Sequence, residues 1–259
     1  MTTSPTSRTQ AERADQTRTR ILEAAVRQFS ENGLAGARTE QIAEEAGVNK
    51  ALLYYYFKSK DALYDAALGM VAEGVRKSSL VVLEGPTSAG ERYLHSVLNH
   101  FDRIHTNRAF QSMMQQEMMR LHRGEGNALS PLVERVFRPI MERTLQVLSE
   151  GIASGELIPV DPAQIQYAAT GANVFYFVSA PLMKIIQGSD PMELSALAFR
   201  GGAAIEYLGQ TLFVDRKHGA AVAARVLAES PMPTNGGNPP RPTPDFGAKS
   251  KKRSRLNKD

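Results

Sequence analysis

Three evenly spaced histidines and the lack of cysteine limit the reactive chemistry of this 259-residue chain. Without cysteine there is no disulfide, no thiolate zinc ligand and no cysteine nucleophile. His95, His100 and His105 are five residues apart, which rotates successive side chains on a helix by about 140°, so they cannot converge from one face. No glycine-rich phosphate loop or Ser-His-Asp signature accompanies them. We therefore expect no catalytic residue, no metal and no cofactor.

The stretch from Arg38 to Phe57 has residue types that suit an element for reading DNA. Two short segments with helical apolar periodicity flank Gly47, a residue at which the backbone can leave a helix. Thr39 is expected to cap the first segment and Asn49 the second. This arrangement is typical of a helix-turn-helix, whose second helix lies in the major groove of DNA.

Three consecutive tyrosines, Tyr54 to Tyr56, belong to this second helix. Because consecutive helical residues point about 100° apart, at least one or two of the hydroxyls must face solvent or a phosphate. We expect Tyr54 and Tyr56 to contact DNA and Tyr55 to pack beside Phe57 against the first helix. For each of the three the opposite assignment, packing or contact, stays open.

Helical periodicity continues on both sides of this motif, and strand signals are nearly absent, so the sequence predicts an all-α fold. The first helix should run from Thr17 to a left-handed stop at Gly33, and another from Lys60, behind the cap Ser59, to about residue 80. Further helices are expected at 88–105, 108–122, 130–153, 162–186 and 191–213. Three of the starts have a capping residue before proline: Ser130–Pro131, Asp161–Pro162 and Asp190–Pro191. Two other prolines should kink or divide their helices: Pro139 and Pro181.

The basic charge of the chain is concentrated at its C-terminal end. Residues 230–259 contain seven basic and two acidic residues, a net charge of +5 against +4 for the whole chain. The remainder is close to neutral, so bulk charge says little about its partners. Six of the 14 prolines lie between Pro231 and Pro244, and we expect both 1–14 and 230–259 to be disordered. No signal peptide is apparent and no apolar run reaches about 18 residues, so we expect a cytoplasmic protein without membrane association.

Three segments with their mutual spacing resemble the TetR family of one-component bacterial regulators, over roughly Arg18 to Leu68. They are ILEAAVRQFSENG, TEQIAEEAGV and NKALLYYYFKSKDAL. The resemblance implies an all-α homodimer with a three-helix DNA-binding domain at 15–75, its helix-turn-helix motif at 38–57, and a ligand-sensing and dimerisation domain at 80–225. It also implies that the helices at 162–186 and 191–213, rich in alanine and glycine, form the dimer interface. An ordinary intramolecular helix pair is the alternative.

The same resemblance assigns DNA-contact roles, some to base edges and some to phosphates. The positions are Thr39, Lys50, Ala51, Leu52, Tyr54, Tyr56 and Lys60. Two residues depart from the family pattern. Leu52 lacks the hydroxyl that its position often carries, and Glu40 stands where a base-reading arginine can occur and could only accept a hydrogen bond. The operator sequence therefore does not transfer from the family.

Large flexible apolar side chains after residue 80 are candidates for a ligand pocket, because methionine and aromatic surfaces adapt to irregular apolar ligands. We expect the pocket lining to be Phe101, Phe110, Met114, Met118, Phe137, Phe175 and Tyr176. Gln115 and Asn173 are candidate polar contacts. Plain core packing is the alternative for any one of these residues.

Together these observations predict a sequence-specific transcriptional regulator, a repressor that a small apolar ligand releases from a palindromic DNA operator. Activation instead of repression stays open. An all-α enzyme is disfavoured because no acid, base and nucleophile set converges. An architectural protein that binds DNA mainly through its basic tail is a third possibility, and it predicts DNA binding that survives loss of the recognition helix.

Overall fold

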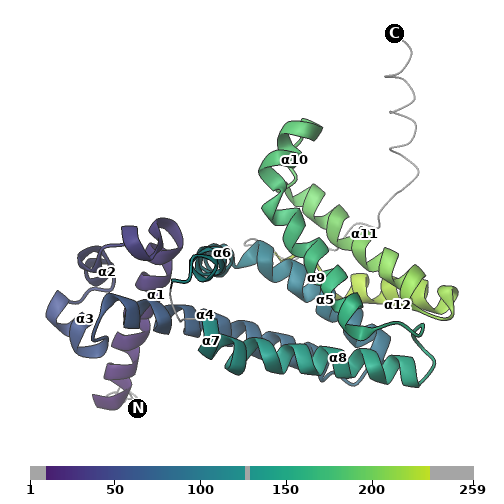
Figure 1. Ribbon diagram of the computed structural model, residues 1–259, viewed down its shortest axis with the longest axis horizontal. Coiled ribbons are helices and arrows are strands. Elements are labelled where there is room, and N and C mark those ends of the chain that lie inside the picture. The colour runs from purple at the N-terminus through teal and green to yellow at the C-terminus, as the bar shows by residue number, and fades with distance from the viewer. Residues whose placement is uncertain (1–9, 126–128, 234–259) are drawn as a thin grey trace, which may run out of the picture. The chain divides into compact units, whose positions relative to one another are not determined.

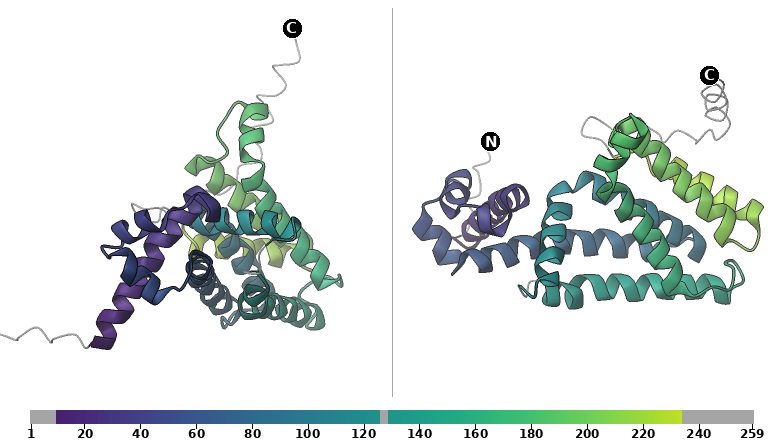
Figure 2. Two further views of the ribbon diagram at one scale, coloured as in Figure 1. Left: turned by 60° about the vertical axis from the view of Figure 1, so that its left-hand side comes forward. Right: turned by 45° about the horizontal axis from the view of Figure 1, so that its top comes forward.

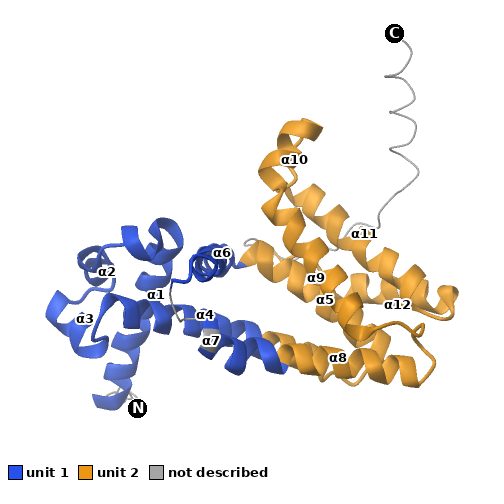
Figure 3. Ribbon diagram, in the orientation of Figure 1, with its two compact units in different colours: residues 1–77, 107–139 blue, residues 78–106, 140–259 orange. Residues whose placement is uncertain are grey.

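The computed structural model describes residues 10–125 and 129–233. These residues form an all-α fold, as predicted, and an isolated antiparallel bridge between Leu157 and Phe213 is their β-type pairing. By its internal contacts the chain divides into two compact units (Figure 3): unit 1 has residues 1–77 and 107–139, and unit 2 has residues 78–106 and 140–259. These units do not coincide with the predicted domains at 15–75 and 80–225, which stay a prediction.

Unit 1 holds the predicted helix-turn-helix (Figure 1). Its helices are α1 (Gln10–Gly36), α2 (Thr39–Glu45), α3 (Lys50–Tyr56), the first part of α4 (Lys60–Leu83), α6 (Arg108–His122), α7 (Leu129–Leu132) and the π-helix η1 (Val133–Phe137). Helix α1 packs against both α2 and α6. The buried side chains of Ile21, Phe29 and Leu63 belong to the core of this unit.

Helix α1 begins earlier than the sequence pattern indicated. It starts at Gln10, so residues 10–14 are helical rather than part of a disordered arm. The negative charge of Glu12 in its first turn interacts favourably with the positive end of the helix dipole. Residues 1–9 lie outside the described part of the chain. At Gly33 the backbone adopts φ 67°, a left-handed conformation that breaks the helix where the sequence predicted a stop.

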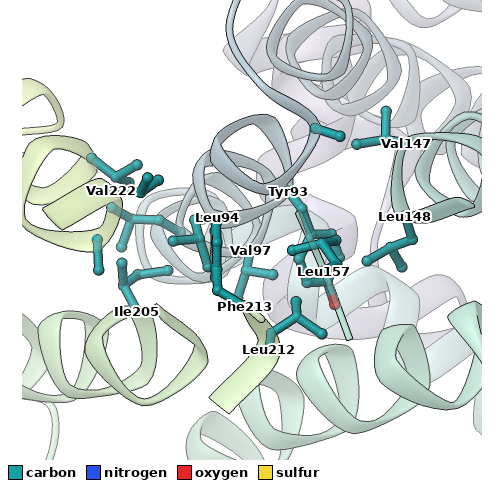
Figure 4. Packing of buried hydrophobic residues seen from close by; sticks show 14 of the residues in the cluster. Tyr93, Leu94, Val97, Val147, Leu148, Leu157, Ile205, Leu212, Phe213 and Val222 are labelled. Atoms are coloured by element: carbon teal, nitrogen blue, oxygen red, sulfur yellow. The ribbon is translucent and has the colours of Figure 1, made fainter. Parts of the chain in front are cut away.

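Unit 2 is a helical bundle (Figures 1 and 2) with a main apolar core and a second, smaller one. Its helices are the end of α4, α5 (Ala89–Thr106), α8 (Arg138–Ala153, from Ile140 on), α9 (Pro162–Val178), α10 (Ala180–Gln187), α11 (Leu194–Leu212) and α12 (Arg216–Glu229). Helix α5 packs against α9, α11 and α12. Figure 4 shows Tyr93, Leu94 and Val97 of α5 among the side chains of neighbouring segments, including Phe213 and Val222.

Prolines divide the helices of unit 2 near the predicted places. Asp161 caps α9 by accepting from the backbone N–H of Ala163 at 2.7 Å, with Pro162 in the first turn. The predicted helix 162–186 is divided just before Pro181, where α9 and α10 meet at a bend of 67°. The predicted helix 130–153 changes from η1, which ends at Phe137, to α8, which begins at the next residue, Arg138. Pro139 lies in the first turn of α8.

Two helix boundaries differ from the predictions. Helix α11 begins at Leu194 rather than at 191, because Asp190 caps a separate turn by accepting from the N–H of Met192 at 2.9 Å. Helix α12 was not predicted, although Asp215 caps it by accepting from the N–H of Lys217 at 2.8 Å.

Among the described residues, no single helix has both the length and the hydropathy of a membrane span; α9 and α10 meet that composition test only as a bent pair. Of the predicted tail at 230–259, residues 234–259 lie outside the described part of the chain. Met232, by contrast, is buried beside Phe101 and Leu197 in a small core.

Candidate nucleic-acid interface

The helix-turn-helix is built by local capping and a small buried seam. Gly47 adopts φ 65° and ends α2 in the turn, as predicted. Asn49 then caps α3, its side-chain oxygen accepting from the N–H of Leu52 at 2.7 Å. Ile42 on α2 and Leu53 on α3 are fully buried, so the two helices are held at a fixed angle and the other face of α3 is left to solvent.

The exposed N-terminal end of α3 carries Lys50, Ala51 and Leu52. Lys50 forms an ion pair with Glu40 of α2. Their hydrogen bond raises the pKa of Lys50 and lowers that of Glu40, so both stay charged near neutral pH. Lys50, which is expected to read bases, is thus held by Glu40, the residue that departs from the family pattern.

The three tyrosines are placed differently from one another. Tyr54 and Tyr56 are half-buried, whereas Tyr55 is 71% exposed. The prediction that Tyr55 packs against the first helix is therefore wrong. Its ring meets Tyr56 edge to face at 5.5 Å and lies 5.9 Å from the Nζ of Lys58, so its surroundings are polar and solvated.

Thr39 does not cap α2 with its side chain, contrary to the prediction. Arg38 occupies the N-cap position, and Thr39 is the first helical residue, with its side chain buried. Its hydroxyl lies 3.3 Å from the hydroxyl of Tyr54. The pair links α2 to α3, and only a small part of Thr39 reaches the surface.

Lys60 lies in the first turn of α4, behind Ser59, which caps the helix by accepting from the N–H of Ala62 at 3.0 Å. The Nζ of Lys60 donates to the carbonyl oxygen of Ala35 at 3.1 Å. A helix N-terminus and an ammonium group at one place suit a phosphate oxygen.

Helix α6 is attached to α1 and α4 by polar contacts. Ser112 donates to the carbonyl oxygen of Ser30 on α1 at 2.7 Å. Glu117, with its side chain only 1% exposed, pairs with Arg120 at 2.9 Å, and the guanidinium of Arg120 lies over the ring of Tyr64. Burial, with Glu117 beside it, raises the pKa of Tyr64 to about 12. A movement of α6 would therefore change its contacts with both α1 and α4.

The seven residues expected to line a ligand pocket are not brought together within either unit. Unit 1 holds Phe110, Met114, Met118 and Phe137; unit 2 holds Phe101, Phe175 and Tyr176. In unit 2, the rings of Phe101 and Tyr176 meet at a tilt, with centroids 5.8 Å apart, in the small core around Met232, which favours the packing alternative for both.

The other candidates differ in exposure. Phe175 is 66% exposed on α9, and Met118 is exposed on α6. Gln115, a candidate polar contact, is also exposed, whereas Asn173 is buried. Unit 2 has two hollows, one between α9 and α11 and a smaller polar one beside α5, and none of the seven residues lines either of them. The apolar pocket stays a prediction.

A hollow of about 430 Å³ in unit 2 lies between α9 and α11. Small side chains form much of its wall, among them Ala168 and Ala172 on α9 and Ala203 and Ala204 on α11. Tyr207, also in the wall, is exposed. This hollow is open to the surface that the sequence assigned to dimerisation.

One group in unit 2 brings together side chains that metals use, namely Glu91, His95 and Glu229, with ligand atoms within 4.8 Å of one another. Arg225 donates to both carboxylate oxygens of Glu91, at 3.1 and 2.5 Å. The guanidinium already supplies the positive charge that a cation would bring, so the arrangement is a salt-bridge network.

Comparison with known proteins gives matches to both halves of the chain. Residues 21–67 match the model for bacterial regulatory proteins of the tetR family, and residues 93–207 match a tetracyclin repressor-like C-terminal domain. The HTH-type transcriptional regulator RutR of Escherichia coli (strain K12) is 28% identical over 171 residues, covering 65% of this chain and 77% of RutR.

Two solved structures show the same fold. A transcriptional regulator from Saccharomonospora viridis in complex with choline aligns with a TM-score of 0.64 at 16% identity, covering 78% of this chain and all of that one. FadR from Bacillus subtilis in complex with stearoyl-CoA aligns with a TM-score of 0.54 at 21% identity, covering 70% and 96%.

Proposed function

Because the chain belongs to the TetR family of bacterial transcriptional regulators, we propose that it is a repressor that binds a pseudo-palindromic operator as a homodimer. The observation that carries this proposal is the exposed N-terminal face of α3, positioned by the cap at Asn49 and the buried seam with α2. A small effector binding outside the DNA-binding helices would release the operator by favouring an arrangement that does not fit DNA. The relatives are regulators, and we propose no catalytic activity.

In this proposal the residues of the interface have separate roles. Lys50, Ala51 and Leu52 face the base edges in the major groove, and Lys50 exchanges Glu40 for a base or a phosphate on binding. Lys60 binds a phosphate together with the N-terminus of α4. Tyr54 and Tyr56 supply hydroxyls to the DNA backbone, which leaves Thr39 mainly the role of positioning Tyr54.

The partner in the dimer is a second copy of this chain, seated on the apolar face of unit 2. Tyr167, Phe175 and Val178 recur along one side of α9 and are more than half exposed. Ile185 on α10 is 82% exposed, and Tyr207 on α11 lies at the hollow with its small side chains. A face of this kind, with small residues that let a partner helix approach, is costly to leave in water.

An experiment on self-association tests the dimer. Tyr207→Asp places a charge on the apolar face at the hollow and should give monomers in sedimentation velocity, together with loss of operator binding. Ala224→Asp, at an exposed position of α12, is the matched control and should remain dimeric. A wild-type protein that sediments as a monomer at operator-binding concentrations would contradict the proposal.

Selection of bound genomic fragments tests the DNA function. The wild-type protein should enrich fragments that share a pseudo-palindrome with half-sites about one helical turn apart or somewhat more. Binding should persist at salt concentrations that abolish binding to random DNA. Enrichment without any shared sequence would favour the architectural alternative and would refute the repressor proposal.

A further inference from the structure

A second hollow in unit 2 differs in chemistry from the apolar one. It has a volume of about 40 Å³ and lies between the end of α4, α5, α8 and α9. Eight of its eleven lining residues are polar or charged, among them Ser96, Thr144, Thr170, Asn173, His100 and Arg103. A cavity of this size holds about three water molecules, or one small charged group in their place.

The cationic side of the cavity is formed by Arg103. Its Nη1 donates to the hydroxyl of Ser78 at 2.9 Å, which fixes the guanidinium at the end of the cavity near α4. Burial lowers the pKa of Arg103 to about 10, so it stays protonated at neutral pH. A guanidinium has planar, paired N–H donors that match a carboxylate.

His100 adds a neutral donor beside this charge. Burial and the nearby Arg103 lower the pKa of His100 to about 4, so the ring is uncharged at neutral pH. The amide nitrogen of Asn173 lies 3.0 Å from the carbonyl oxygen of Val97 and 3.3 Å from the Nδ1 of His100. With Nδ1 accepting from this amide, the ring proton is on Nε2, which can donate.

The remaining polar groups give the cavity the character of an anion site. Thr170 accepts from the Nε2 of Gln166 at 2.9 Å, which leaves its own hydroxyl proton for another acceptor. Among the eleven described residues that line the cavity, none is aspartate or glutamate. The Thr144 hydroxyl donates to the carbonyl oxygen of Ile140 at 2.8 Å, so the guanidinium, the imidazole N–H and the hydroxyl of Thr170 are the donors that favour an anion over a cation such as a quaternary ammonium ion.

We propose that this cavity binds the carboxylate group of a small organic acid, with Arg103 as its charged partner, and that such an acid is the effector. The second part rests on the proposed repressor function. The cavity shares Val97, Ala169 and Asn173 with the wall of the apolar hollow. The hydrocarbon part of the acid would therefore lie against α9, on the side of the apolar hollow, and α9 is one of the helices assigned to the dimer. This effector class differs from the small apolar ligand that the sequence predicted.

Binding of defined acids to the full-length protein tests the site. The probes are acetate, butyrate, hexanoate and benzoate, each compared with its primary amide, together with choline and inorganic phosphate. Calorimetry and the thermal shift should show binding of at least one acid at millimolar concentration or below, and at least tenfold weaker binding of the corresponding amide and of choline. Binding of none of the acids, equal binding of an acid and its amide, or binding of phosphate alone would overturn the proposal.

Variants separate the proposed contact from a general effect on folding. Arg103→Gln should weaken the acid about ten- to a hundredfold, as expected for loss of a charged hydrogen-bond partner. Arg103→Lys keeps the charge without the planar fork and should retain part of the affinity. Arg216→Gln, at an exposed position of α12, is the control and should bind like the wild type. Unchanged acid affinity in a folded Arg103→Gln protein would overturn the proposal.

Operator binding by the same proteins distinguishes the two levels of the proposal. The acid that binds should release the operator, and the operator should weaken acid binding by the same factor. A protein that binds the acid but does not recognise an operator would refute the repressor function and leave the carboxylate site standing. A protein that recognises an operator and binds the acid without releasing the DNA would refute the effector role.

Discussion

Gly219 is a position at which one added methyl group should be expensive, because α12 crosses α11 there backbone against backbone. A Cβ on Gly219 would lie 2.0 Å from the carbonyl oxygen of Gly209 and 2.7 Å from the Cβ of Phe213. A Cβ on Gly209 would in turn lie 2.6 Å from the carbonyl oxygen of Gly219. Backbone atoms cannot rotate out of the way, so the helices themselves must move.

The size of the effect follows from these distances. Restoring an ordinary contact of 3.4 Å from 2.0 Å requires α11 and α12 to separate by about 1.4 Å. Overpacking costs about 1–3 kcal/mol, and the backbone contact places Gly219→Ala at the upper end of that range. The better helix propensity of alanine returns about 1 kcal/mol. We therefore expect a net loss of about 2 kcal/mol, or about 4–8 °C in Tm.

Thermal and urea unfolding followed by circular dichroism measure this loss. Protein concentration is held fixed, because dimerisation would make Tm depend on it. The control is Gly74→Ala in α4, where a Cβ meets nothing within 4 Å and alanine should stabilise by up to about 1 kcal/mol. Gly219→Ala with wild-type stability would refute the close crossing of α11 and α12.

Three further predictions concern charged groups. Lys60→Ala should weaken binding to all DNA sequences similarly and reduce the salt dependence by about one phosphate per subunit, as measured by fluorescence anisotropy against salt; a changed base preference would contradict this role. Glu40→Gln should free Lys50 and raise affinity for random DNA several-fold at low salt, an effect that should vanish at high salt. His100 has a folded-state pKa of about 4, below its unfolded value of about 6.5. Its contribution to the free energy of unfolding is therefore complete above pH 6.5 and is lost as pH falls toward 4. Urea unfolding at several pH values should show that His100→Gln removes up to about 3 kcal/mol of this pH dependence, and identical pH profiles would contradict it.

Several features that depend only on neighbouring residues in the chain could be predicted from the sequence, although the cap predicted at Thr39 is wrong and α12 was missed. The stops at Gly33 and Gly47, the caps at Asn49 and Asp161, and the division of a helix at Pro181 all require only a few adjacent residues. Their physical basis is backbone freedom, orphan N–H groups at a helix start, and the missing N–H of proline.

Features that depend on contacts between distant segments could not be predicted. Tyr55 differs from its neighbours only in the direction of its side chain, which depends on how α3 packs against α2. The prediction of one apolar pocket grouped Met114 with Phe175 by residue type, whereas the fold places them in different units. From the sequence, His100 is considered only as a metal-binding or catalytic candidate and Arg103 is given no role, because nothing local shows that both residues line the same cavity as Thr170.

The most direct test of DNA recognition by α3 is the base preference of the protein on its selected operator, measured for every single-base substitution in a half-site. For the wild type, a few substitutions in each half-site should weaken binding, each by about 1–3 kcal/mol, at symmetry-related positions. Lys50→Ala should change the preference at one symmetric pair of positions and leave the other positions as they were. An unchanged preference profile in Lys50→Ala, with Leu52→Ala also unchanged, would contradict base reading by the N-terminal end of α3.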